Sequence, residues 1–201
     1  MKNPKAQKQA QNQAQNQINV AGRFPMLHKA VNRATLWHTG QDRKYSQVPY
    51  IVHPLRVMSI VRSVSDNEAM LCAAALHDVV EDTHATELDV RREFGDTVAD
   101  LVMWLTDVSK PEDGNRRVRK DIDLAHSADA PAEAQTIKLA DLIDNTRSIT
   151  SADPDFAVVY MAEKERLLSV LTKGHPTLQA EAQAKLRHYQ NERLQEALRD
   201  G

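Results

Sequence analysis

The sequence has little cysteine: Cys72 is the single one, so no disulfide can form within the chain. Cytoplasmic proteins keep their thiols reduced, and this cysteine usage therefore favours a cytoplasmic location. Cys72 lies in an apolar segment, where a free cysteine ordinarily packs as a small, inert side chain. The amino terminus also lacks the apolar core that marks a secretory signal peptide.

The sequence also lacks a long apolar run and a marked excess of one charge. No stretch approaches the ~18 consecutive apolar residues of a membrane-spanning helix, which argues against a membrane protein. The 26 basic and 28 acidic residues leave a formal net charge of -2, which argues against a general attraction to nucleic acid or to an anionic membrane. We therefore expect a small molecule as the partner, and association into a homo-oligomer stays open.

Residues 2–19 are mostly lysine, glutamine, asparagine and alanine. Such a segment buries too little apolar surface to offset the entropy lost on ordering, so residues 1–22 are predicted to form a disordered tail or a frayed helix. A segment that binds a partner is the alternative. The remaining residues, 23–201, are enough for one domain with a full core.

From Phe24 onward, apolar residues recur at helical spacing, and no stretch alternates in the manner of a half-buried strand. Asp66 is a plausible helix cap, and Gly95 separates two short helical segments. The pattern predicts an all-α fold of roughly eight to ten helices. The predicted helices are 25–39, 54–64, 67–81, 86–94, 96–106, 115–125, 131–148, 154–172 and 176–198.

The segment 76–83 places four polar side chains at the end of an apolar run. Burying them without partners would cost several kcal/mol, so a metal ion is the expected partner. In a continuous helix, His77 lies one turn before Glu81 on one face. Asp78 and Asp82 have the same spacing beside them. A hydrogen-bonded pair at a helix end is the alternative interpretation of His77 and Asp78.

Two further segments offer additional metal ligands. His53 directly precedes Pro54, and because proline is favoured at the first helical position, we expect His53 at the rigid start of a helix. Asp141 lies among aliphatic residues, with Asn145 one turn later on the same face. Mixed imidazole and carboxylate ligation suits manganese, iron, zinc or magnesium. The predicted metal ligands are His53, His77, Asp78 and Asp141.

The order of these residues resembles the HD phosphohydrolase superfamily, and within it the RelA/SpoT-type alarmone hydrolases. The resemblance implies an all-helical fold, manganese as the metal, and a guanosine or adenosine nucleotide with a diphosphate on its 3′ oxygen as substrate. The length of 201 residues suggests a stand-alone small alarmone hydrolase without synthetase or regulatory domains. The resemblance covers roughly residues 24–172 and rests on the segments His38–Lys44, Pro49–Pro54, Ala75–Thr83, Phe94–Gly95 and Lys138–Asp141, with Asn145 and Arg147.

The resemblance also implies catalytic and substrate-binding roles. Glu81 and Asp82 match the acidic pair that positions and deprotonates the attacking water, with a solvated helix face as the alternative. Arg43 and Lys44 match cations that meet the base and the phosphates, with ordinary loop charges as the alternative.

Three more residues are candidate substrate contacts. Asn145 resembles the family residue that contacts the sugar or phosphate, and Tyr160 lies where the family has an aromatic residue near the ribose. A helix hydrogen bond and a core tyrosine are the respective alternatives. Lys110 is a further candidate, for which an ordinary exposed loop lysine is the favoured alternative. The chain departs from the family pattern at 46–48 and 104–107, so base preference and the phosphate-binding residues do not follow from the resemblance alone.

The sequence therefore predicts a metal-dependent hydrolase that releases pyrophosphate from (p)ppGpp or (p)ppApp. An HD phosphohydrolase acting on a nucleoside monophosphate, a dNTP or a cyclic dinucleotide is one alternative. The basic loop, Gln41–Pro49 with Arg43 and Lys44, and the segment Tyr50–Pro54 argue against it. The second alternative is a non-catalytic HD domain that senses alarmones. The presence of both Glu81 and Asp82 argues against that interpretation.

Overall fold

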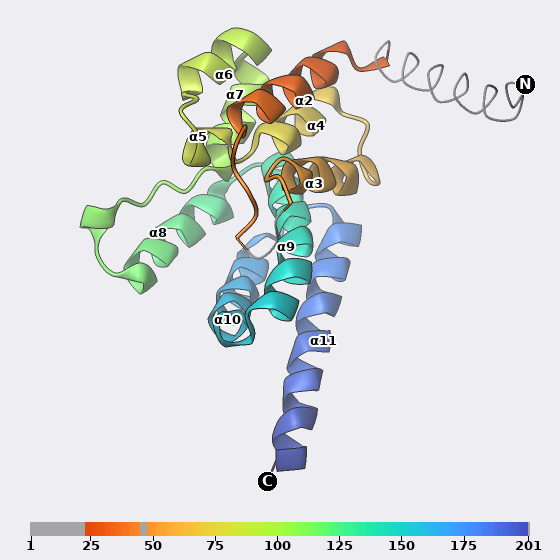
Figure 1. Ribbon diagram of the computed structural model, residues 1–201, viewed down its shortest axis with the longest axis vertical. Helices are drawn as coiled ribbons and strands as arrows, with labels where there is room; N and C mark the ends of the chain where they lie inside the picture. The colour runs from red at the N-terminus through yellow and green to blue at the C-terminus, as the bar shows by residue number, and fades with distance from the viewer. Residues whose placement is uncertain (1–22, 45–47, 201) are drawn as a thin grey trace, which may run out of the picture.

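A computed structural model describes residues 23–44 and 48–200 of the chain. Within this part the chain forms α-helices and a short 3₁₀ helix, η1 (Figure 1). Extended backbone pairs there only at an isolated antiparallel bridge between Asp42 and Pro49. The predicted all-α fold is confirmed, whereas the predicted tail 1–22 lies outside the described residues.

Helices α2 to α7 are short, and longer helices follow them (Figure 1). The first group is α2 (Pro25–Trp37), α3 (Val52–Arg62), α4 (Glu68–Leu76), α5 (Val79–Asp82), α6 (Glu87–Phe94) and α7 (Asp96–Leu105). The second group is η1 (Pro111–Asp113), α8 (Arg116–Asp129), α9 (Ala132–Ala152), α10 (Pro154–Val170) and α11 (Pro176–Asp200).

Two central helices organise the core. Every residue of α4 from Met70 to Leu76 is buried, as expected for a helix that is apolar on all sides. This helix contacts α2, α3, α7 and α9, and α9 in turn contacts α3, α7, α10 and α11. Polar side chains on α9 and at the end of α4 are therefore held inside the packed core, where their positions are rigid.

The predicted helix 67–81 is wrong, because the chain forms two helices there. In a continuous helix the Asp78 N–H would donate to the Ala74 carbonyl oxygen. Instead, Nδ1 of the His77 ring lies 2.9 Å from that oxygen and donates to it. The chain turns at Asp78, with φ -98° and ψ -4°, before α5 begins. The break frees His77 and Asp78 from the fixed angle between neighbouring side chains on a regular helix.

Helix α3 begins at Val52, two residues earlier than predicted, so His53 lies in its first turn. Pro54 is tolerated there because N–H groups in the first turn have no acceptor within the helix. The His53 N–H donates to the Tyr50 carbonyl oxygen at 2.9 Å. His53 is thus held at a helix start, as its position before Pro54 suggests.

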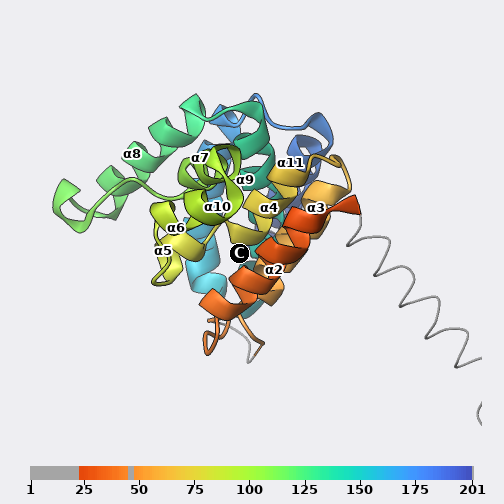
Figure 2. The ribbon, with the colours of Figure 1, turned by 90° about the horizontal axis from the view of Figure 1, so that it is seen from above.

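The carboxyl-terminal helix α11 extends well beyond the other helices (Figure 1), and in the view from above α8 lies on the opposite side of the molecule from α3 (Figure 2). Its first half packs on α9 and α10 through Leu178, Ala182 and Leu186, which are buried. Leu194 and Leu198 in its second half are exposed. None of the helices that the structure describes combines the length and the apolar character needed to cross a membrane.

Candidate metal centre and substrate cavity

The four predicted metal ligands converge from three parts of the fold. Nε2 of His53 lies 3.1 Å from Oδ1 of Asp141 and 3.6 Å from Oδ2 of Asp78. Nε2 of His77 lies 3.0 Å from the same oxygen of Asp78 and 3.8 Å from that of Asp141. Ligand atoms of His53, His77 and Asp141 all lie within 4.8 Å of one another. Two ligands each about 2.2 Å from one ion lie within about 4.4 Å, so a small adjustment would let one ion contact them all.

The hydrogen bonds of the two rings leave both Nε2 atoms available for a metal. Nδ1 of His77 donates to the Ala74 carbonyl oxygen, and Nδ1 of His53 bonds to Oδ2 of Asp144 at 2.8 Å. In the neutral form of each ring, Nε2 is therefore an acceptor that faces the carboxylates. Nε2 of His77 is buried and has no hydrogen-bond partner among the described residues. Acceptors this close repel one another unless a cation or a proton lies between them, so these residues fit a divalent metal.

The pKa of His53 shows how strongly this centre attracts positive charge. Burial lowers its pKa, but hydrogen bonds to Asp141 and Asp144 outweigh burial and raise it to about 9. The two histidines in turn hold the pKa of Asp78 below its ordinary value against the opposing effect of burial. Protons and a metal would therefore compete for this site, as expected for deprotonated ligands.

Two further side chains, Asp144 and Tyr50, contact the proposed ligands and were not among the predicted site residues. Asp144 is buried on α9 and bonds to His53, and the Tyr50 hydroxyl donates to Oδ2 of Asp78 at 2.7 Å. The sequence spacing does point to Asp144, because an aspartate three residues after Asp141 lies on the same helix face. Tyr50 lies three residues before His53, but its contact with Asp78 depends on tertiary packing.

Glu81 and Asp82 lie on α5 next to the centre; each residue is exposed as a whole, but neighbouring groups partly shield its carboxylate from water. Oε2 of Glu81 accepts a hydrogen bond from the Asp107 backbone N–H at 3.3 Å. Desolvation of its carboxyl group, followed by the negative charge of Asp107, raises the pKa of Glu81. Desolvation and the charge of Asp78 likewise raise the pKa of Asp82. Both carboxylates are thus suited to accept a proton beside the centre.

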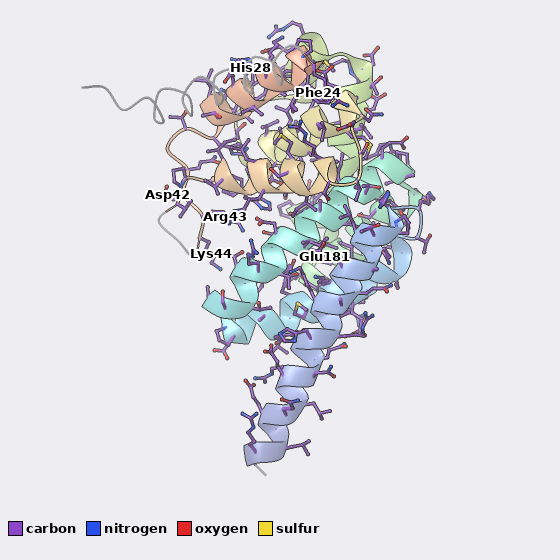
Figure 3. All side chains as sticks on the ribbon, turned by 90° about the vertical axis from the view of Figure 1, so that its right-hand side faces the viewer. Phe24, His28, Asp42, Arg43, Lys44 and Glu181 are labelled. Atoms are coloured by element: carbon purple, nitrogen blue, oxygen red, sulfur yellow. The ribbon has the colours of Figure 1, made fainter. Side chains whose placement is uncertain are left out.

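A chain of hydrogen bonds links the basic loop to the centre. The Arg43 guanidinium donates to Oδ1 of Asn145 at 3.1 Å and to the Ser148 hydroxyl at 2.9 Å. Nδ2 of Asn145 donates to Oδ1 of Asp141 at 2.6 Å. Figure 3 shows Arg43 beside Lys44 on the loop between α2 and α3, and Nζ of Lys44 lies 5.4 Å from the centroid of the Phe156 ring.

A cavity of about 170 Å³ lies between α8, α9 and α10, and its lining includes Asp141, Asn145 and Tyr160. A second pocket of about 250 Å³ lies beside Arg43 and includes His53 in its lining. Three of the five predicted substrate contacts, Arg43, Asn145 and Tyr160, line one of these two spaces. Lys44 lines neither space and lies beside the Phe156 ring. Lys110 also lines neither space and is exposed at the start of η1.

An all-helical fold with a buried cluster of histidine and aspartate side chains is typical of a class of metal-binding helical domains. Residues 30–173 match the family described as HD domain, and the chain belongs to that family. The expected resemblance to RelA/SpoT-type hydrolases is confirmed.

Named relatives lie within this family. Over 124 residues, the chain is 39% identical to the guanosine-3′,5′-bis(diphosphate) 3′-pyrophosphohydrolase MESH1 of Drosophila melanogaster, an alignment that covers 60% of this chain and 68% of MESH1. It is 40% identical over 125 residues to the guanosine-3′,5′-bis(diphosphate) 3′-pyrophosphohydrolase of Haemophilus influenzae, which covers 59% of this chain and 18% of that protein. The chain thus spans less than a fifth of the length of several curated relatives.

A solved structure has the same fold. It is that of a metazoan orthologue of SpoT described as hydrolysing ppGpp, and it matches with a TM-score of 0.73 and 29% sequence identity. The match covers 81% of this chain and 94% of that one.

Proposed function

We propose that this protein is a divalent-metal-dependent hydrolase that removes the 3′-diphosphate of (p)ppGpp and releases pyrophosphate. One observation carries the proposal: the unpartnered Nε2 of His77 faces a histidine–aspartate cluster beside the acidic pair Glu81 and Asp82. The relatives named as ppGpp 3′-pyrophosphohydrolases support the choice of substrate. We extend the proposal to (p)ppApp, to manganese as the metal, and to a single hydrolase domain formed by residues 23–201.

In this mechanism His53, His77, Asp78 and Asp141 would hold the metal, and Asp144 and Tyr50 would orient two of these ligands. A bound metal supplies a positive charge that polarises the phosphate and makes water more acidic. Glu81, assisted by Asp82, accepts the proton of the attacking water, in keeping with their raised pKa values. The water oxygen bonds to the phosphorus on the 3′ oxygen, and the bond between that phosphorus and the 3′ oxygen breaks. The 3′ oxygen then takes a proton and becomes a hydroxyl group.

The substrate is held by the basic loop and by the cavity. Arg43 and Lys44 provide positive charge for the base and the phosphates, and the bond between Arg43 and Asn145 positions both near Asp141. Asn145 and Tyr160 contact the sugar or phosphate from the cavity wall. Lys110 is proposed as a peripheral contact, which requires the substrate to reach the exposed start of η1.

The test is product analysis. The manganese-loaded protein is incubated with guanosine and adenosine nucleotides that carry a 3′-diphosphate, alongside dNTPs, nucleoside monophosphates and cyclic dinucleotides. Chromatography should resolve pyrophosphate and the intact 5′-di- or triphosphate, with no orthophosphate as first product. Turnover of only dNTPs, monophosphates or cyclic dinucleotides would point to another HD phosphohydrolase. Tight binding of the alarmone without turnover would point to a sensor.

A further inference from the structure

Lys164 on α10 is a buried cation without a negative partner. Its side chain is only 1% exposed, and its ammonium group donates to the Thr146 hydroxyl oxygen at 2.6 Å. It forms no ion pair with a carboxylate anywhere in residues 23–44 and 48–200. An unpaired charge in the interior is costly, and proteins usually compensate it with an ion pair or a bound ligand.

Lys164 lines the 170 Å³ cavity that reaches Asp141 and Asn145. Tyr160 lies one turn earlier on α10 and lines the same cavity, and its buried hydroxyl has no hydrogen-bond partner among the described residues. Two residues with unused donors therefore line one space beside the candidate metal centre, because the Lys164 ammonium has three N–H groups and one hydrogen-bond partner among the described residues, and the Tyr160 hydroxyl has none. The cavity is smaller than the roughly 300 Å³ or more of a typical small-molecule site, so it suits one anionic group of a larger ligand.

The other charges of the cavity are largely matched. Asp123 accepts hydrogen bonds from the backbone N–H groups of Val108 and Ser109, at 3.1 and 2.9 Å. Lys138 lies near carboxylates that raise its pKa against the effect of burial, with Asp141 contributing most. The remaining cavity charges form the ion pairs Lys120–Asp107, Arg116–Glu163 and Arg166–Asp121.

We propose that Lys164, together with Tyr160, binds a phosphate group of the substrate in this cavity. The ammonium and hydroxyl groups donate to phosphate oxygens, and the phosphate supplies the negative charge that Lys164 lacks. The identity of the phosphate as part of an alarmone nucleotide rests on the proposed function. The anion site itself rests on the burial and contacts of Lys164 and Tyr160.

The first test measures the binding of inorganic pyrophosphate to the metal-loaded full chain by calorimetry. Lys164→Met keeps a long side chain and removes the charge, so the dissociation constant should rise about tenfold or more, the scale of one charge-assisted hydrogen bond. Arg166→Met is the control, because Arg166 lines the same cavity but is half exposed and paired with Asp121. We expect it to change the affinity far less. Equal affinities of wild type and Lys164→Met would overturn the proposal.

A second measurement separates binding from a structural role. If Lys164 only tethered α10 to α9, Lys164→Met would lower the thermal midpoint of the ligand-free protein and leave pyrophosphate binding unchanged. We expect an equal or higher midpoint, because the substitution removes an unpaired buried charge. Tyr160→Phe keeps the ring and should weaken pyrophosphate binding in the same direction. Unchanged binding in both variants would contradict the site.

Kinetics with two substrates then identify the phosphate. Both carry a 3′-diphosphate, and only one also carries 5′ phosphates. If Lys164→Met raises KM for both substrates, the site binds the 3′-diphosphate. If it raises KM only for the substrate that also carries 5′ phosphates, the site binds the 5′ phosphates. If the wild-type protein hydrolyses neither, the proposed function fails. The pyrophosphate titration would still decide whether Lys164 binds an anion.

Discussion

Nδ1 of His53 lies 2.8 Å from Oδ2 of Asp144, and both side chains are almost fully buried. Because a carboxylate only accepts hydrogen bonds, this contact places the proton of the neutral ring on Nδ1 and turns Nε2 toward Asp141. Metal-binding histidines commonly have such a carboxylate behind them, which fixes the ring and makes it a stronger ligand. Asp144 would therefore act on a bound metal through His53.

Asp144→Asn should weaken metal binding by about 10- to 100-fold, the range for partners of this kind. The amide keeps the shape of the carboxylate but loses its charge. The measurement is a metal titration of the metal-free protein. Asp100→Asn is the matched control, because Asp100 is an exposed aspartate paired with Arg91. Equal affinity in the wild type and Asp144→Asn would contradict the orienting role.

Substitution of any one proposed ligand by alanine should lower bound metal, as measured by elemental analysis. It should also remove the stabilisation that metal confers, which is about 2.7 kcal/mol at a metal concentration about 100 times Kd. A chelator should abolish turnover until metal is restored. His84→Ala, at an exposed histidine, is the control and should change neither quantity. Full activity of the metal-free protein would refute the mechanism. The variants are His53→Ala, His77→Ala, Asp78→Ala and Asp141→Ala.

Glu81→Gln should lower kcat by ~10²-fold or more, the scale of general-base catalysis, because the amide cannot accept the proton. Metal content should stay close to that of the wild type, since Glu81 is not a proposed ligand. Arg43→Ala is the comparison and should act mainly on KM. Normal turnover by Glu81→Gln would transfer the proton-accepting role to Asp82 or another group.

We expect Lys164 to make the stability of the protein depend on pH in the alkaline range. Burial lowers its pKa to about 8, with Lys185 adding to the effect and Asp141 and Glu181 opposing it. Between pH 8 and the ordinary pKa of 10.5, the unfolded chain binds the extra proton, so the free energy of unfolding rises with pH. Relative to Lys164→Met, the wild type should gain on the order of 3 kcal/mol across this range.

Urea denaturation of both ligand-free proteins at several pH values between 7 and 10.5 checks this prediction. The difference between the two proteins isolates Lys164, because other groups titrate in both. A constant difference across the range would show that the pKa of Lys164 is not lowered in the folded protein.

The positions of most helices follow from the sequence alone, because apolar periodicity and local caps depend on neighbouring residues. The predicted helix 86–94 is found as Glu87–Phe94, where Thr86 and Asp89 form a capping box. Gly95 has φ 82°, which favours glycine and separates α6 from α7. The proposed metal ligands were also identifiable, because polar side chains in apolar helical segments need a partner.

Other features depend on contacts between residues far apart in the sequence, and only the tertiary structure decided them. The bond between His53 and Asp144 joins α3 to α9, and the contact between Tyr50 and Asp78 joins the residues just before α3 to the break after α4. The lack of an ion pair at Lys164 likewise results from how α10 packs against its neighbours. Helical spacing predicts which side of a helix a residue occupies, but the chemistry of the facing side chain is set by how the helices pack.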